Sequence, residues 1–196
     1  MKAAKTHYGK RWSRFCAWML KTMGWTADGG PMPEPKAIVL GVPHTSIWDF
    51  MVSYFFYSAF GEVAHVMIKK EFFFWPVGPI LRACGCIPVD RSSATGMVKS
   101  LIEEMDKVDF FKLAIAPEGT RKPVAKWKTG ALFIAKETGV AIYLGYFDWK
   151  TRHIGCGEKF TPTGDTKADL EAIQEYYSKM GLEGKNRKGY IYSREK

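Results

Sequence analysis

The sequence predicts an α/β fold in which a mixed, largely parallel β-sheet is flanked by helices. Three observations lead to this prediction. Short apolar runs of strand length recur along the chain and alternate with longer segments of helical periodicity. The first such run, at residues 37–42, is rich in β-branched residues and is typical of a strand buried on both faces. The chain is also 196 residues long, which suits one domain with a single substantial core.

Composition and charge limit the classes of partner. Lysine and arginine outnumber aspartate and glutamate by 29 to 20, and the net charge of +9 indicates a membrane surface, a nucleic acid or a phosphorylated ligand as partner. A hydrophobic share of 46% excludes general disorder. The four cysteines are too few for a disulfide scaffold, and the spacing of Cys84 and Cys86 does not fit a zinc knuckle. We therefore expect reduced thiols, a cytosolic location and no bound metal.

Residues 10–25 predict a basic amphipathic helix. Its apolar arc consists of Trp12, Phe15, Cys16, Met19, Leu20 and Met23. Such a helix is typical of an interfacial membrane segment, but packing on the domain fits the pattern equally well, and both interpretations stay open. The sequence shows no signal peptide and no apolar stretch approaching the ~20 residues of a transmembrane helix. A linker rich in glycine and proline is expected at residues 28–35.

The remaining elements follow from periodicity and from turn residues. Residues 47–60 predict a helix that is apolar on nearly every face, and residues 63–68 a second strand. The aromatic run at residues 72–81 fits either core or a surface in contact with lipid headgroups. Further strands are expected at residues 87–89, 112–116, 140–149 and 152–156, and the last two are candidates for pairing with each other. Further helices are expected at residues 94–108, 129–139 and 166–180. The charged tail from Gly181 is expected to fray.

Polar residues follow the first strand. Pro43 ends this strand because proline cannot donate to a sheet ladder. His44 is then expected in a loop at the carboxyl end of the strand, where α/β sheets usually bind ligands, with Asp49 in the first turn of the next helix. A carboxylate there could bond one imidazole nitrogen, fix the tautomer and leave the other nitrogen as a general base. The alternative is structural: with Ser46 as the N-cap, Asp49 fits a capping box and His44 is an ordinary loop residue.

Four motifs occur in order along the chain. They are His44-x4-Asp49, the block Gly85-Cys-Ile-Pro-Val-Asp90-Arg91, the block Pro117-Glu118-Gly119-Thr120-Arg121, and Lys128-Thr-Gly130-Ala131 at the start of a helix. Their order and spacing, over residues 36–150, resemble the glycerolphosphate and lysophosphatidate acyltransferase family. The chain departs from the family in one motif, because the strand that contains a proline there corresponds to the proline-free residues 140–146. It is also short for the family, with one apparent amino-terminal helix.

The resemblance implies a glycerolphosphate acyltransferase-like fold and an activity in phospholipid biosynthesis. A fatty acyl group would pass from acyl-coenzyme A or acyl-carrier protein, as co-substrate, to the hydroxyl of a lysophosphatidate-like lipid acceptor. His44 would be the general base for this hydroxyl, and Asp49 would orient its ring and stabilise the imidazolium. No metal and no cofactor beyond the co-substrate are implied.

The resemblance also implies the substrate-binding residues. Arg91 and Arg121 would bind the acceptor phosphate through the paired donors of guanidinium. Glu118 would hold an arginine or the loop, Gly119 would permit a tight turn, and Thr120 belongs to the same block. Three lysines that follow fit either the phosphates of coenzyme A or a solvated basic face: Lys122, Lys126 and Lys128.

The expected organisation is a membrane-associating segment at residues 1–30, an acyltransferase domain at residues 36–180 and a charged tail at residues 181–196. We expect a cytoplasmic protein that is peripherally associated with the inner face of the cell membrane, with an anionic membrane surface as partner and no nucleic acid. Three alternatives remain open. They are a non-phosphate acceptor such as an aminolipid, a hydrolase that uses His44 to activate water, and a non-enzymatic basic membrane-binding module.

Overall fold

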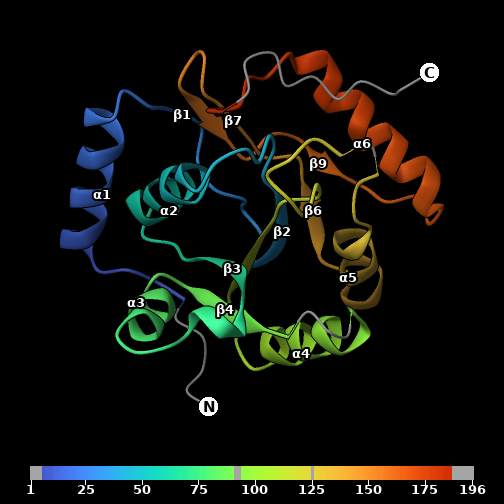
Figure 1. The fold of residues 1–196 in the computed structure, drawn as a ribbon, viewed down its shortest axis with the longest axis horizontal. Helices are drawn as coiled ribbons and strands as arrows, with labels where there is room; N and C mark the ends of the chain where they lie inside the picture. The colour runs from blue at the N-terminus through green and yellow to red at the C-terminus, as the bar shows by residue number, and fades with distance from the viewer. Residues whose placement is uncertain (1–5, 91–93, 125, 187–196) are drawn as a thin grey trace.

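The structure, a computed structural model, describes residues 6–90, 94–124 and 126–186. Its main feature is a six-stranded sheet with the order β4-β3-β5-β2-β6-β9 (Figure 1). The strands are β2 (Lys36–Leu40), β3 (Ala64–Lys69), β4 (Cys86–Val89), β5 (Phe111–Ile115), β6 (Ala141–Tyr143) and β9 (Lys159–Phe160). The first five pair in parallel, and β9 runs antiparallel to β6. The predicted mixed, largely parallel sheet is therefore confirmed.

A second, three-stranded sheet contains β1 (Thr26–Asp28), β8 (His153–Gly155) and β7 (Tyr146–Asp148). The single strand predicted over residues 140–149 is wrong, because Leu144 and Gly145 divide it between the two sheets. A Cβ atom at position 145 would lie 2.7 Å from the carbonyl oxygen of Leu40. Only glycine therefore allows the backbone to pass this close to β2. The expected pairing with residues 152–156 is confirmed by the antiparallel register of β7 and β8.

Helices cover both faces of the main sheet (Figure 1). α1 (Lys10–Thr22) and α2 (Trp48–Ala59) lie on one face, and α4 (Ala94–Asp106), α5 (Gly130–Thr138) and α6 (Thr166–Met180) lie on the other. Successive residues of a strand point to opposite faces. Ala37 and Val39 of β2 therefore join the core beneath α2, while Ile38 and Leu40 join the core beneath the other three helices. The central strand is buried on both faces, as its apolar sequence predicts.

α1 packs on α2 and still exposes aromatic side chains. Cys16 and Leu20 are buried in the core that α1 shares with α2. Trp12 donates from Nε1 to the hydroxyl of Tyr54 in α2 at 3.0 Å. Three aromatic side chains of the helix remain exposed: Trp12, Phe15 and Trp18. The packing interpretation is therefore confirmed, and the exposed aromatic face that an interfacial helix needs is still present. Within the described part of the chain, every helix is too short or too polar to cross a membrane.

The aromatic run at residues 72–81 lies on the surface. β3 leads into a 3-10 turn, η1 (Lys70–Phe72), and then into a short helix, α3 (Val77–Ala83), which was not expected from the sequence. Four large apolar side chains of this region are exposed: Phe72, Phe74, Trp75 and Ile80. Of the two interpretations of this run, core is wrong and a surface is confirmed, while its contact with lipid stays a prediction.

Residues 181–186 pack against the domain, so the expected fraying from Gly181 is wrong for this part of the tail. The side chain of Leu182 is buried. The backbone N–H of Glu183 donates to Oδ1 of Asp148 at 2.9 Å. An apolar anchor and a satisfied backbone hydrogen bond thus hold a segment whose charged composition favours solvent. Residues 187–196 lie outside the described residues.

Candidate active site

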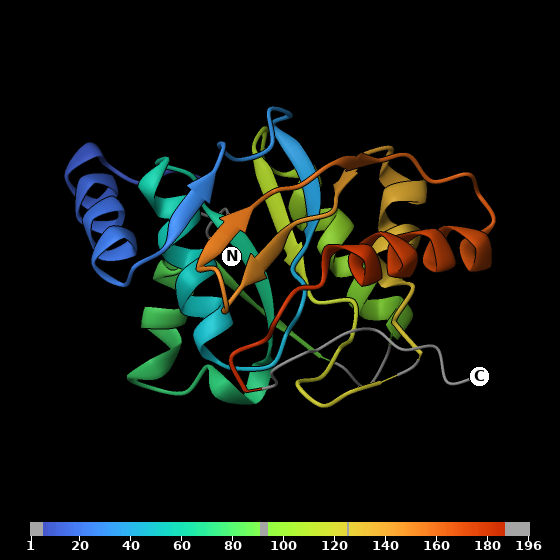
Figure 2. The same cartoon turned by 90° about the horizontal axis from the view of Figure 1, so that it is seen from above.

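The carboxyl ends of the parallel strands bring several loops together at one edge of the main sheet. The loop after β2, the loop after β5 and the segment after α6 gather along the bottom of Figure 2. β2 lies between β5 and β6, so its loop occupies the middle of this edge. Open parallel sheets usually bind ligands at such an edge.

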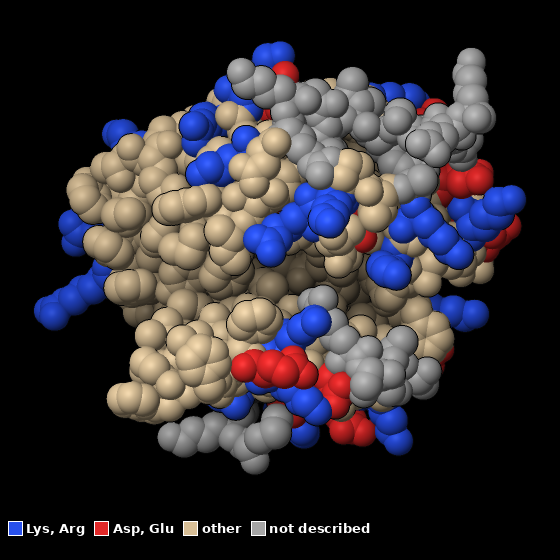
Figure 3. Space-filling view, in the orientation of Figure 1, with Lys and Arg blue, Asp and Glu red and all other residues tan. Residues whose placement is uncertain are grey.

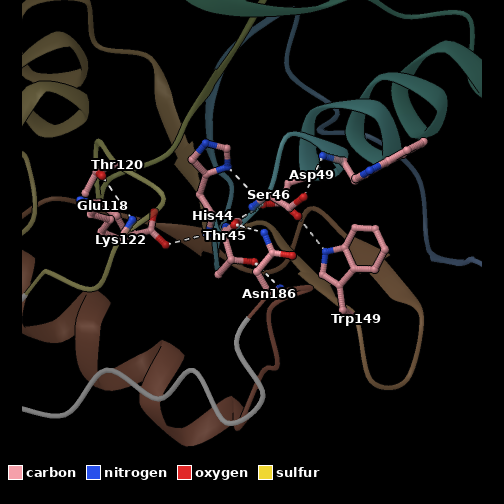
Figure 4. A network of polar contacts seen from close by, with 10 residues as sticks. His44, Thr45, Ser46, Asp49, Glu118, Thr120, Lys122, Trp149 and Asn186 are labelled. Carbon is pink, nitrogen blue, oxygen red and sulfur yellow. Dashed lines mark hydrogen bonds and ion pairs between the residues drawn. The ribbon is translucent and has the colours of Figure 1, made fainter.

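His44 lies in the loop after β2 and faces Asp49 at the start of α2 (Figure 4). Its Nδ1 is 3.3 Å from Oδ2 of Asp49. The side chain of His44 is 29% exposed, whereas that of Asp49 is 1% exposed. Because Nδ1 is directed at the carboxylate, the second ring nitrogen, Nε2, is left for a substrate.

Asp49 also organises the start of α2. Its Oδ2 accepts the backbone N–H groups of Thr45 and Ser46, each at 2.7 Å. The capping and the orienting interpretations of Asp49 are therefore compatible with one geometry. Ser46 lies one residue before the cap position, Ile47, so its expected role as the N-cap is wrong. Its Oγ instead accepts the N–H of Trp48 at 3.3 Å.

Glu118 connects the loop after β5 to His44. Its side chain is buried, and its Oε1 accepts the backbone N–H of His44 at 2.9 Å. Its Oε2 is also buried and has no hydrogen-bond partner among the described residues. Burial raises the pKa of Glu118 to about 7, although the N–H of His44 opposes this shift. Glu118 therefore holds the loop after β2, and its expected role in holding an arginine stays a prediction.

Backbone hydrogen bonds shape the rest of this loop. Gly119 turns with a φ of +66°, and a side chain there would press on Lys128. The N–H of Lys128 donates to the carbonyl oxygen of Pro117 at 2.7 Å and closes the loop. Oγ1 of Thr120 accepts the N–H of Lys122 at 3.2 Å. Gly119 and Thr120 thus contribute to the shape of the loop, and their contact with substrate stays a prediction.

Cationic side chains lie beside a hollow at this edge of the sheet. Figure 3 looks onto the edge and shows lysine and arginine side chains above, to the right of and below a hollow near its centre, with an acidic patch further below. Four exposed cations belong to the loop after β5: Arg121, Lys122, Lys126 and Lys128. Arg91, the other expected phosphate ligand, lies outside the described residues. In the part that the structure describes, no group of three or more His, Cys, Asp or Glu side chains is placed to hold a metal ion.

Two groups at the site come from segments that the motifs did not include. Trp149 follows β7 and donates from Nε1 to Oδ1 of Asp49 at 2.8 Å. Asn186 follows α6 and donates from Nδ2 to the carbonyl oxygen of Thr45 at 3.0 Å. No sequence signal connects either residue with the loop after β2, because tertiary packing alone brings them there.

This arrangement is suited to removing a proton from a hydroxyl group or from water. A carboxylate holds one imidazole nitrogen, which leaves the other nitrogen as a base on the partly exposed side of the ring. The basic loop next to it is suited to an anionic substrate, since exposed cations attract and bind phosphate oxygens. The site thus combines a general base with an anion-binding surface.

Comparisons with known proteins identify the family of the chain and a solved structure with a similar fold. Residues 30–144, more than half of the chain, match the family described as acyltransferase. Among solved structures, the chain is similar to the 1-acyl-sn-glycerophosphate (LPA) acyltransferase PlsC from Thermotoga maritima, with a TM-score of 0.58 and 18% identity over 87% of this chain and 79% of that chain. At this identity the likeness shows the fold alone. Comparison with curated proteins gave no match.

Proposed function

The chain belongs to the acyltransferase family, and from this premise we propose that it transfers a fatty acyl group from an acyl thioester to the hydroxyl of a lysophosphatidate-like lipid. The observation that carries the proposal is the pairing of His44 Nδ1 with Asp49 Oδ2 at 3.3 Å, at the carboxyl edge of the sheet. The choice of acceptor is supported by the similar fold of the Thermotoga maritima structure, which is named as a 1-acyl-sn-glycerophosphate (LPA) acyltransferase.

The reaction needs a base because the pKa of an alcohol lies far above neutrality. His44 Nε2 takes the proton as the acceptor oxygen attacks the thioester carbonyl carbon. The carbon–sulfur bond then breaks, and the imidazolium returns the proton to the leaving thiolate. Asp49 stabilises the imidazolium during this step. The acceptor itself is the nucleophile, so no acyl-enzyme forms, and positioning of the two bound substrates supplies much of the acceleration.

The cations of the loop after β5 favour the interpretation that both the acceptor and the acyl donor carry phosphate groups. Arg121 offers the paired donors that suit the phosphate of the acceptor. Lys122, Lys126 and Lys128 are exposed nearby and suit the phosphates of coenzyme A or of the carrier-protein prosthetic group. No further cofactor enters the proposal.

We place the protein in the cytoplasm, at the inner face of the cell membrane. The carboxyl edge carries an aromatic rim, which consists of Trp48, Phe72, Phe74 and Trp75, and all of these side chains are exposed. Figure 3 shows a largely uncharged shoulder over α1, α2 and α3 beside the hollow. Exposed tryptophans next to basic residues favour the interface of an anionic bilayer. This orientation turns the hollow toward the lipid acceptor.

An acceptor panel tests the proposal. The purified protein is incubated with labelled acyl-coenzyme A or acyl-carrier protein and with lysophosphatidate, glycerol 3-phosphate, other lysophospholipids or an aminolipid, and lipid products are read by mass spectrometry. We expect thioester consumption that depends on an acceptor with a phosphate monoester. Consumption without any acceptor would indicate a hydrolase, and product on the aminolipid alone would contradict the assigned acceptor class.

Arg121→Ala should raise the apparent KM for a phosphate acceptor by several-fold to about a hundredfold, because a hydrogen bond to a charged group contributes ~1.5–3 kcal/mol. Lys136→Ala is the control, since Lys136 is an exposed cation on α5 outside the loop after β5. Initial rates over a range of acceptor concentrations measure the effect. An unchanged acceptor KM in Arg121→Ala would remove this residue from the phosphate site and leave the role of His44 intact.

A further inference from the structure

Trp149 lies beyond the residues that match the acyltransferase family, yet it contacts the candidate catalytic carboxylate. We propose that Trp149 is a positioning residue, whose indole N–H fixes the Asp49 carboxylate so that Oδ2 faces Nδ1 of His44. This inference rests on the proposed function, in which His44 is the general base.

The two oxygens of Asp49 have separate partners. Oδ2 faces the N–H groups of Thr45 and Ser46 and the ring of His44. Oδ1 accepts from Trp149 at 2.8 Å (Figure 4). The side chain is 1% exposed, so water has little access to replace the indole donor. Loss of this donor leaves a buried carboxylate oxygen unpaired and removes one of the restraints that keep the carboxylate directed at the imidazole.

The indole ring is itself held from several sides. Its ring meets Trp25 edge to face, with the centroids 5.0 Å apart. The guanidinium of Arg152 lies 5.0 Å and the ammonium of Lys185 lies 4.8 Å from the ring centroid. The backbone N–H of Trp149 donates to the carbonyl oxygen of Glu183 at 2.9 Å. A ring fixed by its neighbours in this way can impose an orientation on a hydrogen-bond partner.

Asp148 builds the turn that presents Trp149. It accepts from the backbone N–H groups of Lys150, Thr151 and Glu183 and from the hydroxyl of Thr151. Burial would raise the pKa of Asp148, but these donors outweigh burial and lower the pKa below its ordinary value. The turn after β7 and the segment after α6 are therefore joined at the residue next to Trp149. The carboxyl-terminal third of the chain thus completes a site whose motifs lie earlier in the sequence.

Trp149→Phe tests the role, because it keeps an aromatic ring and removes the donor. The matched control is Trp25→Phe, since Trp25 contacts the same ring but its Nε1 has no hydrogen-bond partner among the described residues. We expect Trp149→Phe to lower kcat by about 10- to 100-fold with the KM values of both substrates changed less than about twofold. Trp25→Phe should retain kcat within about threefold of the wild type, because no hydrogen bond to the carboxylate is lost.

The second readout is the tautomer of His44, measured by 15N NMR of histidine-labelled protein without substrate and assigned with His44→Ala. Wild type and Trp25→Phe should hold the neutral ring with its proton on Nδ1, and Trp149→Phe should give a mixture of tautomers. Trp149→Phe is also combined with Asp49→Ala. In this background it should lower kcat by less than about twofold relative to Asp49→Ala alone, because the indole acts through the carboxylate.

The outcomes separate the two proposals. An unchanged kcat or an unchanged tautomer in Trp149→Phe overturns the positioning role, as does an equal loss of kcat in the Asp49→Ala background. A wild-type protein that gives no product on any acceptor overturns the proposed function instead. In that case the tautomer measurement, which needs no substrate, still decides whether Trp149 positions the pair.

Discussion

His44, Asp49 and Glu118 lie within one hydrogen-bonded network but differ in their exposure to solvent. Asp49 is buried and surrounded by donors, so its charge is compensated in place. His44 keeps 29% of its side chain exposed, so it is able to meet a substrate. Glu118 is buried with one oxygen bonded to the backbone of His44 and the other without a partner among the described residues. The two buried carboxylates therefore orient His44, and the partly exposed imidazole is the group that can transfer a proton.

Substitution of His44 and Asp49 should affect activity to different degrees. His44→Ala should abolish nearly all acyl transfer, because the base is lost. Asp49→Asn should lower turnover less than His44→Ala does, because the base remains while its tautomer is no longer fixed. Turnover with the preferred acceptor measures both effects, and circular dichroism checks the fold. Wild-type turnover by folded His44→Ala would show that the proposed mechanism is wrong.

Glu118→Gln should change how stability depends on pH. Burial raises the pKa of Glu118 from its ordinary value of 4.5 to about 7, so the neutral form is favoured in the folded state. The stability that this group contributes is therefore fully present below pH 4.5 and is lost as the pH rises through 7. Between these values the wild type should lose about 3 kcal/mol of unfolding free energy relative to Glu118→Gln.

Urea denaturation of both proteins at several pH values between 4 and 8 measures this difference. Glutamine keeps an acceptor for the N–H of His44, so the comparison isolates the charge. A difference in unfolding free energy that stays constant over this range would show that Glu118 titrates at its ordinary pKa.

Among the elements, β5 carries a buried ionisable side chain near each end. Lys112, near its start, is buried, and its Nζ donates to the carbonyl oxygen of Met32 and lies 3.3 Å from Oε2 of Glu62. Glu118 lies beyond its carboxyl end, next to His44. The charge of Lys112 is compensated by a carboxylate and a carbonyl oxygen, so it serves the fold. The carboxyl end of β5 faces the site and leads to Glu118, whose buried Oε2 has no hydrogen-bond partner in the part of the chain that the structure describes.

The exposed face of α1 should bind an anionic bilayer. Deletion of residues 1–30 would not test this, because Cys16, Leu20 and Trp25 are buried in the core. Phe15→Ser with Trp18→Ser removes apolar area from the exposed face of α1 and leaves the buried Cys16 and Leu20 unchanged. It should weaken binding to vesicles with anionic lipid, measured by sedimentation. Binding by the wild type should also fall as the salt concentration rises.

Phe133→Ser on α5 is the control for this variant, because Phe133 is similarly exposed but lies on the opposite face of the main sheet. Equal binding by the α1 variant and the wild type would contradict the role of α1. The double change Phe74→Ser and Trp75→Ser would then test whether the aromatic rim binds the bilayer instead.

For the whole molecule, the order of the strands decides where the chemistry lies. Parallel pairing of β2 with β5 and with β6 puts the carboxyl ends of three strands at one edge. Segments that are far apart in the sequence meet there: residues 44–49, residues 117–128, Trp149 and Asn186. The net charge of +9 includes the cations beside the hollow, so the field of the whole molecule attracts anionic substrates to this edge.

The sequence by itself determined the features that depend on neighbouring residues. The burial of β2 on both faces follows from its apolar composition, and α6 follows from its helical periodicity and ends at Gly181. The contact of His44 with Asp49 follows from the closeness of the two residues along a strand end and a helix start. Each of these features needs only a short stretch of chain, which is why local pattern predicted the strand and the helix, although for His44 it left an ordinary loop residue as the alternative.

Tertiary structure decided the features that depend on distant segments. The division of residues 140–149 into two strands results from the close approach of Gly145 to Leu40, which no local pattern records. Residues 181–186 pack against the domain because Leu182 is buried in the core and the backbone N–H of Glu183 donates to Asp148. Trp149 reaches Asp49 across 100 positions of sequence, through the pairing of β7 with β8. A hydrogen bond between such distant residues exists only once the two sheets are assembled, so it has no local sequence signal.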